Sequence, residues 1–434
     1  MQHLRRRHLI ALTAALACCA APAVAAMPQR ELYIHAGRLI DGLSDTARTD
    51  QCITVRGDRI VAVEPCGPTP ATMQRVDWSQ LTVLPGLIDL HTHLADVGQS
   101  ADLAEPLKNS PAATALVGAR NARVTLMAGF TSVRDVGTYR GLTDIALRNA
   151  IARGDVPGPR MWVAGAYLTI PGGGGELNGV VPDNRDLPAD MRLGVAATAD
   201  EAAARTAALL DAGADFIKVV ATGAVLAIGT EPGEPEFTPD QLRAIVTTAH
   251  ARGKKVTAHA HGTIGIRNAI LAGVDSIEHA SLADEAVLQL AKESGVALNM
   301  DIYNGDYIDT EGRQQGWPEE YLRKNRETTD VQRGAFRRAV QLGIRLGYGT
   351  DAGVYPHGNN ARQFAYMVRY GMTPIQAIQS ATSIAASIIG AETDIGAIAP
   401  GRYADLIAVA DDPLADITVL ERPAHVMQGG ALVR

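Results

Sequence analysis

The stretch Val83-Leu84-Pro85-Gly86-Leu87-Ile88-Asp89-Leu90 runs directly into His91-Thr92-His93. Its apolar run, which begins at Thr82 and ends at Leu90, predicts a buried β-strand. Alternate residues of a strand point to the same side, so two imidazoles with this spacing can converge on one metal ion. A lone H-x-H pair is a weak signal, because most such pairs are incidental. Whether His91 and His93 bind a metal ion therefore has to be judged from the rest of the chain.

The middle of the chain repeats one pattern: a short apolar strand, a polar turn, and an Ala/Leu-rich helix that ends in Gly. The predicted strands are residues 82–90, 131–136, 161–166, 215–221, 255–260, 276–279, 296–302 and 344–350. Thr238-Pro239 and Thr373-Pro374 are N-cap and N1 pairs that open helices, and Gly253 and Gly390 follow their ends. Eight strands alternating with helices predict an α/β fold, a (β/α)8 TIM barrel. A doubly wound open sheet is the weaker alternative, and no G-x-G-x-x-G follows the first strand.

The two flanks of the chain contain shorter strands, which are predicted at residues 32–34, 52–55, 60–63, 404–409 and 425–427. Gly57-Asp58 is a hairpin turn signal between the second and third of these strands. We expect residues 27–84 and 395–434 to pair into one composite β-sandwich domain. Residues 85–394 then form the barrel.

Residues 1–26 have the pattern of a signal peptide. Arg5-Arg6-Arg7 precedes the apolar run 9–21, and Ala23-Val24-Ala25 is a small-x-small cleavage site. We therefore expect an exported protein, periplasmic or secreted, with no membrane span in the mature chain. Cys18 and Cys19 leave lipid anchoring open, although the alanines before Cys18 make a poor lipobox.

The cysteines that remain after cleavage are Cys52 and Cys66. An oxidising compartment permits a disulfide between them. The turn at Gly57-Asp58 places residue 52 opposite about residue 63, so Cys66 lies just past the hairpin. A bridge is geometrically possible but not required, and two buried free thiols are the alternative.

The composition excludes several classes of protein. Of 434 residues, 47% are hydrophobic, and 40 Lys or Arg against 47 Asp or Glu give a formal charge of −7. A largely disordered chain would have lower hydrophobicity and a larger charge imbalance. No basic run follows the first seven residues, so we expect no nucleic-acid partner. A small molecule is the expected partner.

Four further predicted strands have a residue that can bind metal or move protons, either within the strand or at its carboxyl end. Lys218 lies in the fourth predicted strand, His259 and His279 end the fifth and sixth, and Asp351 follows the eighth. Active sites of such barrels lie at the carboxyl ends of the strands, so these side chains should meet His91 and His93. Imidazoles suit Zn²⁺ and similar metals, and a carboxylate can both bind metal and accept a proton.

Lys218 is the unusual member of this set, because an ammonium group repels a cation. Desolvation beside metal ions lowers the pKa of a lysine, and the neutral amine can react with CO2 to form a carbamate. A carbamate is anionic and has two oxygens, so it can bridge two metal ions. A surface lysine is the alternative, which the apolar strand around Lys218 disfavours.

The complete set resembles the metal-dependent amidohydrolase superfamily. More narrowly, the chain resembles the branch with imidazolonepropionase-related dipeptidases of the Xaa-Pro and Xaa-Arg types and ochratoxin-degrading amidohydrolases. The similarity covers roughly residues 30 to 430. It includes the entry Leu84-Pro85-Gly86-Leu87-Ile88-Asp89, the segment 129–135 (GFTSVRD) and the exit 395–405 (IGAIAPGRYAD).

The resemblance implies a binuclear centre with two divalent metal ions, zinc first among them. His91, His93 and Asp351 would bind the buried ion, His259 and His279 the more exposed one, and carboxylated Lys218 both. Asp351 would act as general base and then general acid. Imidazolonepropionase is a single-metal enzyme without the bridging lysine, so Lys218 argues against that activity. Relatives of this type commonly assemble, which implies a homo-oligomer.

Two further histidines are predicted to bind substrate. His261 points to the same side of its strand as His259, and His357 lies in the loop after Asp351. His261 is also an alternative proton acceptor. In this branch the loop after the third strand often carries Gly-Gly-His; here residues 170–176 (IPGGGGE) lack the histidine, so this part of the pocket departs from the pattern of the branch. His35 and His250 are expected to be structural or exposed.

The predicted reaction is hydrolysis of a carboxamide bond that releases an amino acid. An N-acyl amino acid such as ochratoxin A, an aryl amide of phenylalanine, fits this class, and so does a Xaa-Pro or Xaa-Arg dipeptide. A cyclic amide or lactone hydrolase on the same metals is the closest alternative. A non-catalytic binding protein is more remote, because it would need no intact ligand set.

Overall fold

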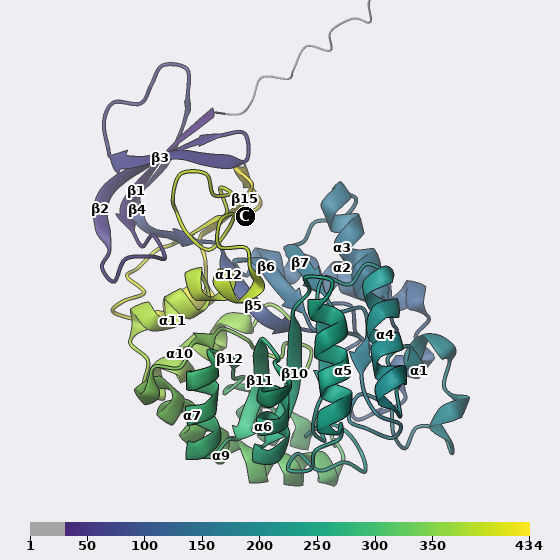
Figure 1. Cartoon of the computed structure of the whole chain (residues 1–434). Coiled ribbons are helices and arrows are strands. Elements are labelled where there is room, and N and C mark those ends of the chain that lie inside the picture. The colour runs from purple at the N-terminus through teal and green to yellow at the C-terminus, as the bar shows by residue number, and fades with distance from the viewer. Residues whose placement is uncertain (1–30) are drawn as a thin grey trace, which may run out of the picture.

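The computed structural model describes residues 31–434, so the predicted signal peptide lies outside the described residues. This part of the chain forms two β-structures, which are the barrel and a separate sheet built from both flanks of the chain (Figure 1). The first strands, in purple, lie beside the yellow C-terminal segment, and the helices of the barrel occupy the other end of the molecule. Within residues 31–434, no helix combines the length and hydropathy that crossing a membrane requires.

The barrel consists of parallel strands in the order predicted from the sequence. They are β5 (Leu87–Thr92), β6 (Phe130–Asp135), β7 (Arg160–Val163), β8 (Tyr167–Leu168), β9 (Ile217–Val220), β10 (Val256–Gly262), β11 (Ser276–Leu282), β12 (Ala297–Asn299) and β13 (Leu346–Gly347). The third strand is in two pieces: β7 pairs with β6 and β8 pairs with β9. The barrel closes where the Leu90 N–H donates to the Tyr348 carbonyl at 2.7 Å. This confirms the TIM barrel and excludes the open sheet.

Residues 82–90 are not one strand, as the sequence predicted, but parts of two. Strand β4 (Gln74–Pro85) belongs to the flank sheet and β5 to the barrel. The break lies at Gly86, whose N–H donates to the Asp405 carbonyl at 2.8 Å. A Cβ at this position would collide with the side chain of Thr131. The hydrophobic pattern of residues 82–90 is the same whether one sheet or two sheets bury the run. The pattern alone therefore did not predict the break at Gly86.

The helices pack outside the barrel strands (Figure 1). They are α1 (Glu105–Lys108), α2 (Pro111–Met127), α3 (Thr143–Arg153), α4 (Ala199–Asp211), α5 (Pro239–His250), α6 (Thr263–Ala272), α7 (Glu285–Ser294), α8 (Asn304–Tyr307), α9 (Glu319–Leu342), α10 (Gln363–Arg369), α11 (Pro374–Ser380) and α12 (Ser383–Ile389). Thr238 and Thr373 each form a capping box, as their Thr-Pro pairs predicted. The helix predicted from Thr373 to Gly390 is two helices, because Thr382 leaves the helical conformation at φ −134° and ψ −101°.

Both flanks contribute to one seven-stranded sheet. Its order is β16-β15-β14-β4-β1-β2-β3, with β1 (Glu31–Leu39), β2 (Arg48–Arg56), β3 (Arg59–Pro65), β14 (Leu406–Val409), β15 (His425–Gln428) and β16 (Ala431–Leu432). The sheet folds over on itself, since the Ile60 N–H donates to the Arg402 carbonyl at 2.9 Å. Its interior is apolar and includes Ile34, Ile53, Trp78 and Leu406. The β-sandwich predicted from the two flanks is confirmed.

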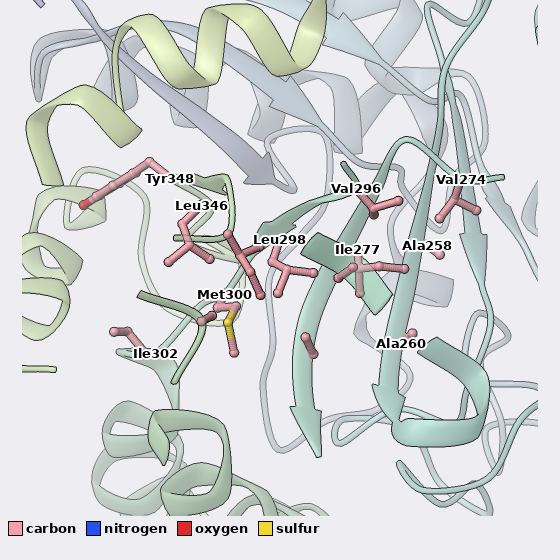
Figure 2. Close-up of a cluster of buried hydrophobic side chains, with 14 of the residues drawn as sticks. Ala258, Ala260, Val274, Ile277, Val296, Leu298, Met300, Ile302, Leu346 and Tyr348 are labelled. Carbon is pink, nitrogen blue, oxygen red and sulfur yellow. The ribbon is translucent and has the colours of Figure 1, made fainter. Parts of the chain in front are cut away.

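The barrel strands are held from outside by a large apolar cluster, part of which Figure 2 shows. Ala258, Ile277, Leu298 and Leu346 pair across β10, β11, β12 and β13 and form one buried row. Side chains alternate along a strand, so the neighbouring row, which contains His259 and Glu278, faces into the barrel. Packing on one face of these strands therefore positions the polar residues on the other.

Cys52 and Cys66 form a disulfide. Cys52 pairs with Glu64 across the hairpin, one residue further than the turn predicts, because a bulge lies between Thr54 and Val55. The bridge spans 14 residues of chain. It joins β2 to the end of β3 and lies in the flank sheet.

Replacing both cysteines with alanine is expected to destabilise the flank domain by about 3 kcal/mol, the chain-entropy value for a loop of this length. The chemistry of the barrel should be unchanged. Thermal unfolding of the two proteins measures the effect. Two titratable thiols in the denatured, unreduced wild type would contradict the bridge.

Candidate metal centre and its cavity

The six side chains predicted to bind metal come together at the carboxyl ends of the barrel strands. His91 lies in β5 and His93 just beyond it, Lys218 lies in β9, His259 in β10 and His279 in β11, and Asp351 follows β13. All six line one cavity of about 150 Å³. Lys218 is only 2% exposed and His91 only 1%. The structure thus brings together residues that span 260 positions of sequence from His91 to Asp351.

His91, His93 and Asp351 form the first group. Oδ1 of Asp351 lies 3.3 Å from Nε2 of His91 and 3.1 Å from Nε2 of His93. Nε2 of both rings therefore faces the same carboxylate oxygen. Two imidazole nitrogens and a carboxylate oxygen in this arrangement are a suitable donor set for a divalent transition metal.

The other nitrogen of three rings is fixed by a partner outside the centre. Nδ1 of His91 lies 2.8 Å from Oε2 of Glu278, Nδ1 of His93 lies 2.9 Å from the Gly137 carbonyl, and Nδ1 of His279 lies 2.8 Å from Oδ1 of Asp301. An acceptor at Nδ1 places the proton there and leaves the Nε2 lone pair free. Nε2 of His279 is buried and has no hydrogen-bond partner among the described residues. The donor set fits a metal ion.

A second group of donors adjoins the first, and His279 lies close to both. Ligand atoms of His259, His261 and His279 lie within 4.8 Å of one another, as do those of His91, His279 and Asp351. Burial, followed by the neighbouring histidines, lowers the pKa of His259 and of His261 well below the usual range. Both rings are neutral at physiological pH, which is the form that binds metal. Two adjacent groups of donors are the arrangement that a pair of ions requires.

Lys218 is buried in strand β9 and lines the same cavity as these groups. Burial lowers its pKa to about 8, although Glu278 and Asp351 act in the opposite direction. A substantial part of the amine is therefore neutral near pH 8. The neutral amine is the form that reacts with CO2.

Backbone strain is concentrated at the centre. His279 has φ 71°, Ala280 φ 49° and Asp351 φ 58°, in the left-handed region that side chains other than glycine rarely adopt. Consecutive residues of a regular strand face opposite sides, yet Glu278 contacts His91 and His279 faces the cavity. The left-handed turn at His279 breaks the alternation and directs both side chains inward.

Several residues that position the ligands were not predicted from the sequence. Arg134 donates to Oε1 of Glu278 at 2.5 Å. Burial alone would raise the pKa of Glu278, but Arg134 and His91 hold it well below the usual range. Nδ2 of Asn304 donates to Asp301 at 2.6 Å and to Asp351 at 3.1 Å. The sequence signal that could have indicated such positioning residues is a charged residue inside an apolar strand, as with Arg134 and Glu278.

Replacing Asp301 with asparagine is expected to lower metal affinity about 10- to 100-fold, because the Nδ1 partner of His279 loses its charge. Competition with a chelator measures the affinity. Asp309→Asn is the control, since Asp309 is exposed and pairs with Arg313. Equal metal affinity in Asp301→Asn and wild type would show that the carboxylate does not support the centre.

The structure separates the two predicted substrate-binding histidines. His261 lines the cavity at the centre, and its Nδ1 lies 2.8 Å from Oγ of Ser281. His357 lines a neighbouring cavity instead, where burial lowers its pKa to about 3. Proximity in sequence to Asp351 does not fix which side of the loop the ring occupies, and a role of His357 in substrate binding stays a prediction. His35 and His250 lie far from the centre and pair with Asp50 and Asp275.

The glycine loop at residues 171–175 forms one wall of the cavity, through Gly174 and Gly175. Glu236 packs against it: the Gly174 N–H donates to Oε1 at 2.7 Å, and the buried Oε2 has no partner among the described residues. A Cβ at Gly173 would lie 2.5 Å from that Oε2. Burial raises the pKa of Glu236 to about 8, so this carboxyl is protonated at neutral pH.

Replacing Glu236 with glutamine is expected to stabilise the protein increasingly as the pH rises. The pKa of Glu236 is raised from about 4.5 to about 8 on folding, so wild type loses stability between these pH values as the unfolded chain ionises first. The slope is at most about 1.4 kcal/mol per pH unit. Unfolding midpoints of both proteins should agree at pH 4 and differ most at pH 9. A constant difference across this range would contradict the raised pKa.

Comparison with known proteins adds a sequence relationship to this geometry. The family model described as "Amidohydrolase family" matches residues 82–433. Ochratoxinase from Aspergillus niger is 32% identical over 422 residues, which cover 92% of this chain and 86% of that protein. Imidazolonepropionase from Streptomyces coelicolor is 28% identical over 393 residues, 87% of each chain.

Solved structures agree with this relationship. A Xaa-Pro dipeptidase with methionine bound in its active site superposes with a TM-score of 0.87 at 36% sequence identity, covering 93% of this chain and 100% of that one. The family match spans the barrel with all six predicted ligands. The chain therefore belongs to the amidohydrolase family and is a hydrolase that acts on amide or peptide bonds.

Proposed function

We propose that this protein is a binuclear metal-dependent amidohydrolase that cleaves a carboxamide bond and releases an amino acid. The observation that carries the proposal is the orientation of three imidazoles. Nδ1 of His91, His93 and His279 is fixed by Glu278, Gly137 and Asp301, which leaves each Nε2 to face the cavity.

We assign His91, His93 and Asp351 to one ion and His259 and His279 to the other. Lys218 would join the two ions as a carbamate. Its amine adds to CO2 through a new N–C bond and loses one proton, which gives a monoanion with two oxygens. Zinc is the metal we favour, although manganese and cobalt bind similar ligands. Two divalent ions, when bound, polarise a carbonyl and lower the pKa of bound water.

Asp351 is the proposed proton carrier. Its Oδ1 faces His91 and His93, while Oδ2 accepts a hydrogen bond from Asn304 at 3.1 Å. This contact holds the carboxylate in one orientation. Asp351 would accept a proton from the attacking water and deliver it to the leaving amine.

His261 is the proposed contact to the substrate. Ser281 engages its Nδ1, so the second ring nitrogen is available to the carbonyl or carboxylate of a substrate. The outer wall of the cavity is apolar, with Leu177, Val180, Leu226, Ile228 and Ile308. Such a wall suits an apolar acyl or amine substituent, as in an aryl amide of phenylalanine or a Xaa-Pro dipeptide.

We also propose that the protein acts outside the cytoplasm, in the periplasm or after secretion. The disulfide in the flank sheet supports this proposal, because such bonds persist in oxidising compartments.

A hydrolysis screen of the metal-loaded enzyme tests the function. N-benzoyl-phenylalanine, Xaa-Pro and Xaa-Arg dipeptides, a cyclic amide and a lactone are supplied in parallel, and each product is quantified. Release of an amino acid from the linear amides supports the proposal. Turnover of the cyclic amide or lactone alone would replace it with that alternative. No turnover by a protein that holds two metal ions would favour a binding protein.

A further inference from the structure

A buried lysine holds one part of the cavity wall. Residues 224–228, which follow β9, line the cavity at the metal centre, and with Gly229 they are called the wall segment here. Lys324, on α9, is 0% exposed, and its Nζ donates to the Ala227 carbonyl at 2.7 Å. Lys324 is not among the described residues that line the cavity. It therefore acts on the cavity through the wall segment.

Glu320 completes this attachment. Its Oε1 lies 2.6 Å from Nζ of Lys324, one helical turn away on α9, and also accepts a hydrogen bond from the Gly229 N–H at 2.9 Å. One ion pair thus holds the wall segment at two backbone positions, 227 and 229. Within the part of the chain that the structure describes, residues 225–229 make no other hydrogen bond to a helix or strand.

A buried ion pair is a costly way to fill space, because the ammonium group loses its hydration. Apolar side chains of similar volume often replace such a pair without loss of stability. The Lys324–Glu320 pair is therefore not explained by stability. It adds direction: both hydrogen bonds to the wall segment have defined partners, whereas apolar packing alone would let the segment shift along α9.

The position of the wall segment matters because of the side chains that it carries. Leu226 and Ile228 flank Ala227, line the cavity, and pack in one cluster with Ile308 and Tyr321. They belong to the apolar wall that suits an apolar substituent of the substrate. In an apolar pocket, a single methylene group changes recognition by about tenfold or more. A small shift of the backbone at Ala227 would therefore change which substituents fit.

We propose that Lys324 is a positioning residue that determines specificity: it fixes Leu226 and Ile228 and so sets the size of the apolar group that the cavity accepts. The proposal deepens the proposed function and rests on it. Lys324 touches neither the metal-binding side chains nor the proton carrier. Its loss should therefore affect KM much more than kcat.

The first measurement is amide hydrogen exchange of the metal-loaded protein, with Lys324→Met as the variant. Methionine has a similar length, and the carboxylate that it leaves behind on Glu320 is 29% exposed, so water can solvate it. Exchange in residues 225–229 is expected to become about tenfold faster, because local opening of the segment costs less free energy. Exchange at the wild-type rate in Lys324→Met would overturn the proposal.

Arg326→Met is the matched control for this variant. Arg326 is exposed on the same helix, and it pairs with Glu319 instead of the wall segment. Exchange in residues 225–229 and all kinetic constants should equal those of the wild type.

The second measurement is a comparison of three substrates: N-benzoyl-phenylalanine, N-acetyl-phenylalanine and N-benzoyl-glycine. In Lys324→Met, KM for the first is expected to rise about tenfold, with kcat within about twofold and metal content unchanged. The rise should be smaller for the analogue that lacks the group facing the wall. An equal rise for all three would contradict a role in size selection. A joint fall of kcat and metal content would also overturn the proposal, since Lys324 would then act on the metal centre.

The double variant Lys324→Met/Glu320→Met separates positioning from stability. It leaves no unpaired charge, so it should unfold no earlier than Lys324→Met, yet show the same faster exchange and higher KM. If the single variant does not fold, the double variant decides, and wild-type exchange and KM in it would overturn the proposal. If the wild type hydrolyses none of the three amides while exchange responds to Lys324→Met, the proposed function fails and the positioning of the wall segment stands.

Discussion

Replacing Lys218 with alanine is expected to remove most of the bound metal and nearly all turnover. Lys218 is 2% exposed and lines the same cavity as the metal-binding histidines and Asp351. Its carbamate would be the anion that both ions share, and alanine supplies no oxygen in its place. Metal content by elemental analysis and initial rates with a linear amide measure the two effects.

The control is Lys255→Ala, because Lys255 is partly buried at the opposite end of β10 and donates to the Ile388 carbonyl. That variant should keep both metal and turnover. A short carboxylic acid added with metal should restore a little activity to Lys218→Ala by replacing the missing oxygens. Two metal ions per chain and wild-type activity in Lys218→Ala would end the carbamate hypothesis.

Replacing Asp351 with asparagine is expected to lower turnover by about two decades or more, the scale of lost general acid–base catalysis. The amide oxygen still faces His91 and His93, so metal content should fall less than in Lys218→Ala. The change removes the carboxylate that accepts the proton. Turnover and metal content measured on the same preparation separate the two roles.

Asp309→Asn, the exposed substitution used above as a control, should leave turnover unchanged. If Asp351→Asn stays within about fivefold of wild-type turnover, the proton is carried by another group. His261 is then the first residue to substitute, because it lines the same cavity.

Much of the barrel could be predicted because its signals are local. Short apolar strands, Thr-Pro helix starts and glycines at helix ends depend on neighbours in the chain. Errors arose where two sheets or two helices share one continuous pattern. Gly86 divides an unbroken apolar run between two sheets, and Thr382 divides one predicted helix into two.

The candidate ligands could be predicted for a similar reason. Carboxyl ends of parallel strands meet at one end of a barrel, so residues such as His91, Lys218 and Asp351 are brought together by topology alone. Their partners could not be predicted in the same way. Glu278, Gly137 and Asp301 reach the three rings from other strands and loops, and nothing in the spacing of the histidines specifies them.

By itself, then, the sequence determined the barrel, the composite flank domain and the residue types at the strand ends, because periodicity and turn chemistry act over a few residues. Tertiary structure decided which nitrogen of each histidine faces the centre, since that depends on an acceptor from a distant segment. It also decided the left-handed turn at His279 and the position of His357 beside the neighbouring cavity. The side of a loop on which a side chain lies depends on the space that its packed neighbours leave free, and this packing is a property of the whole fold.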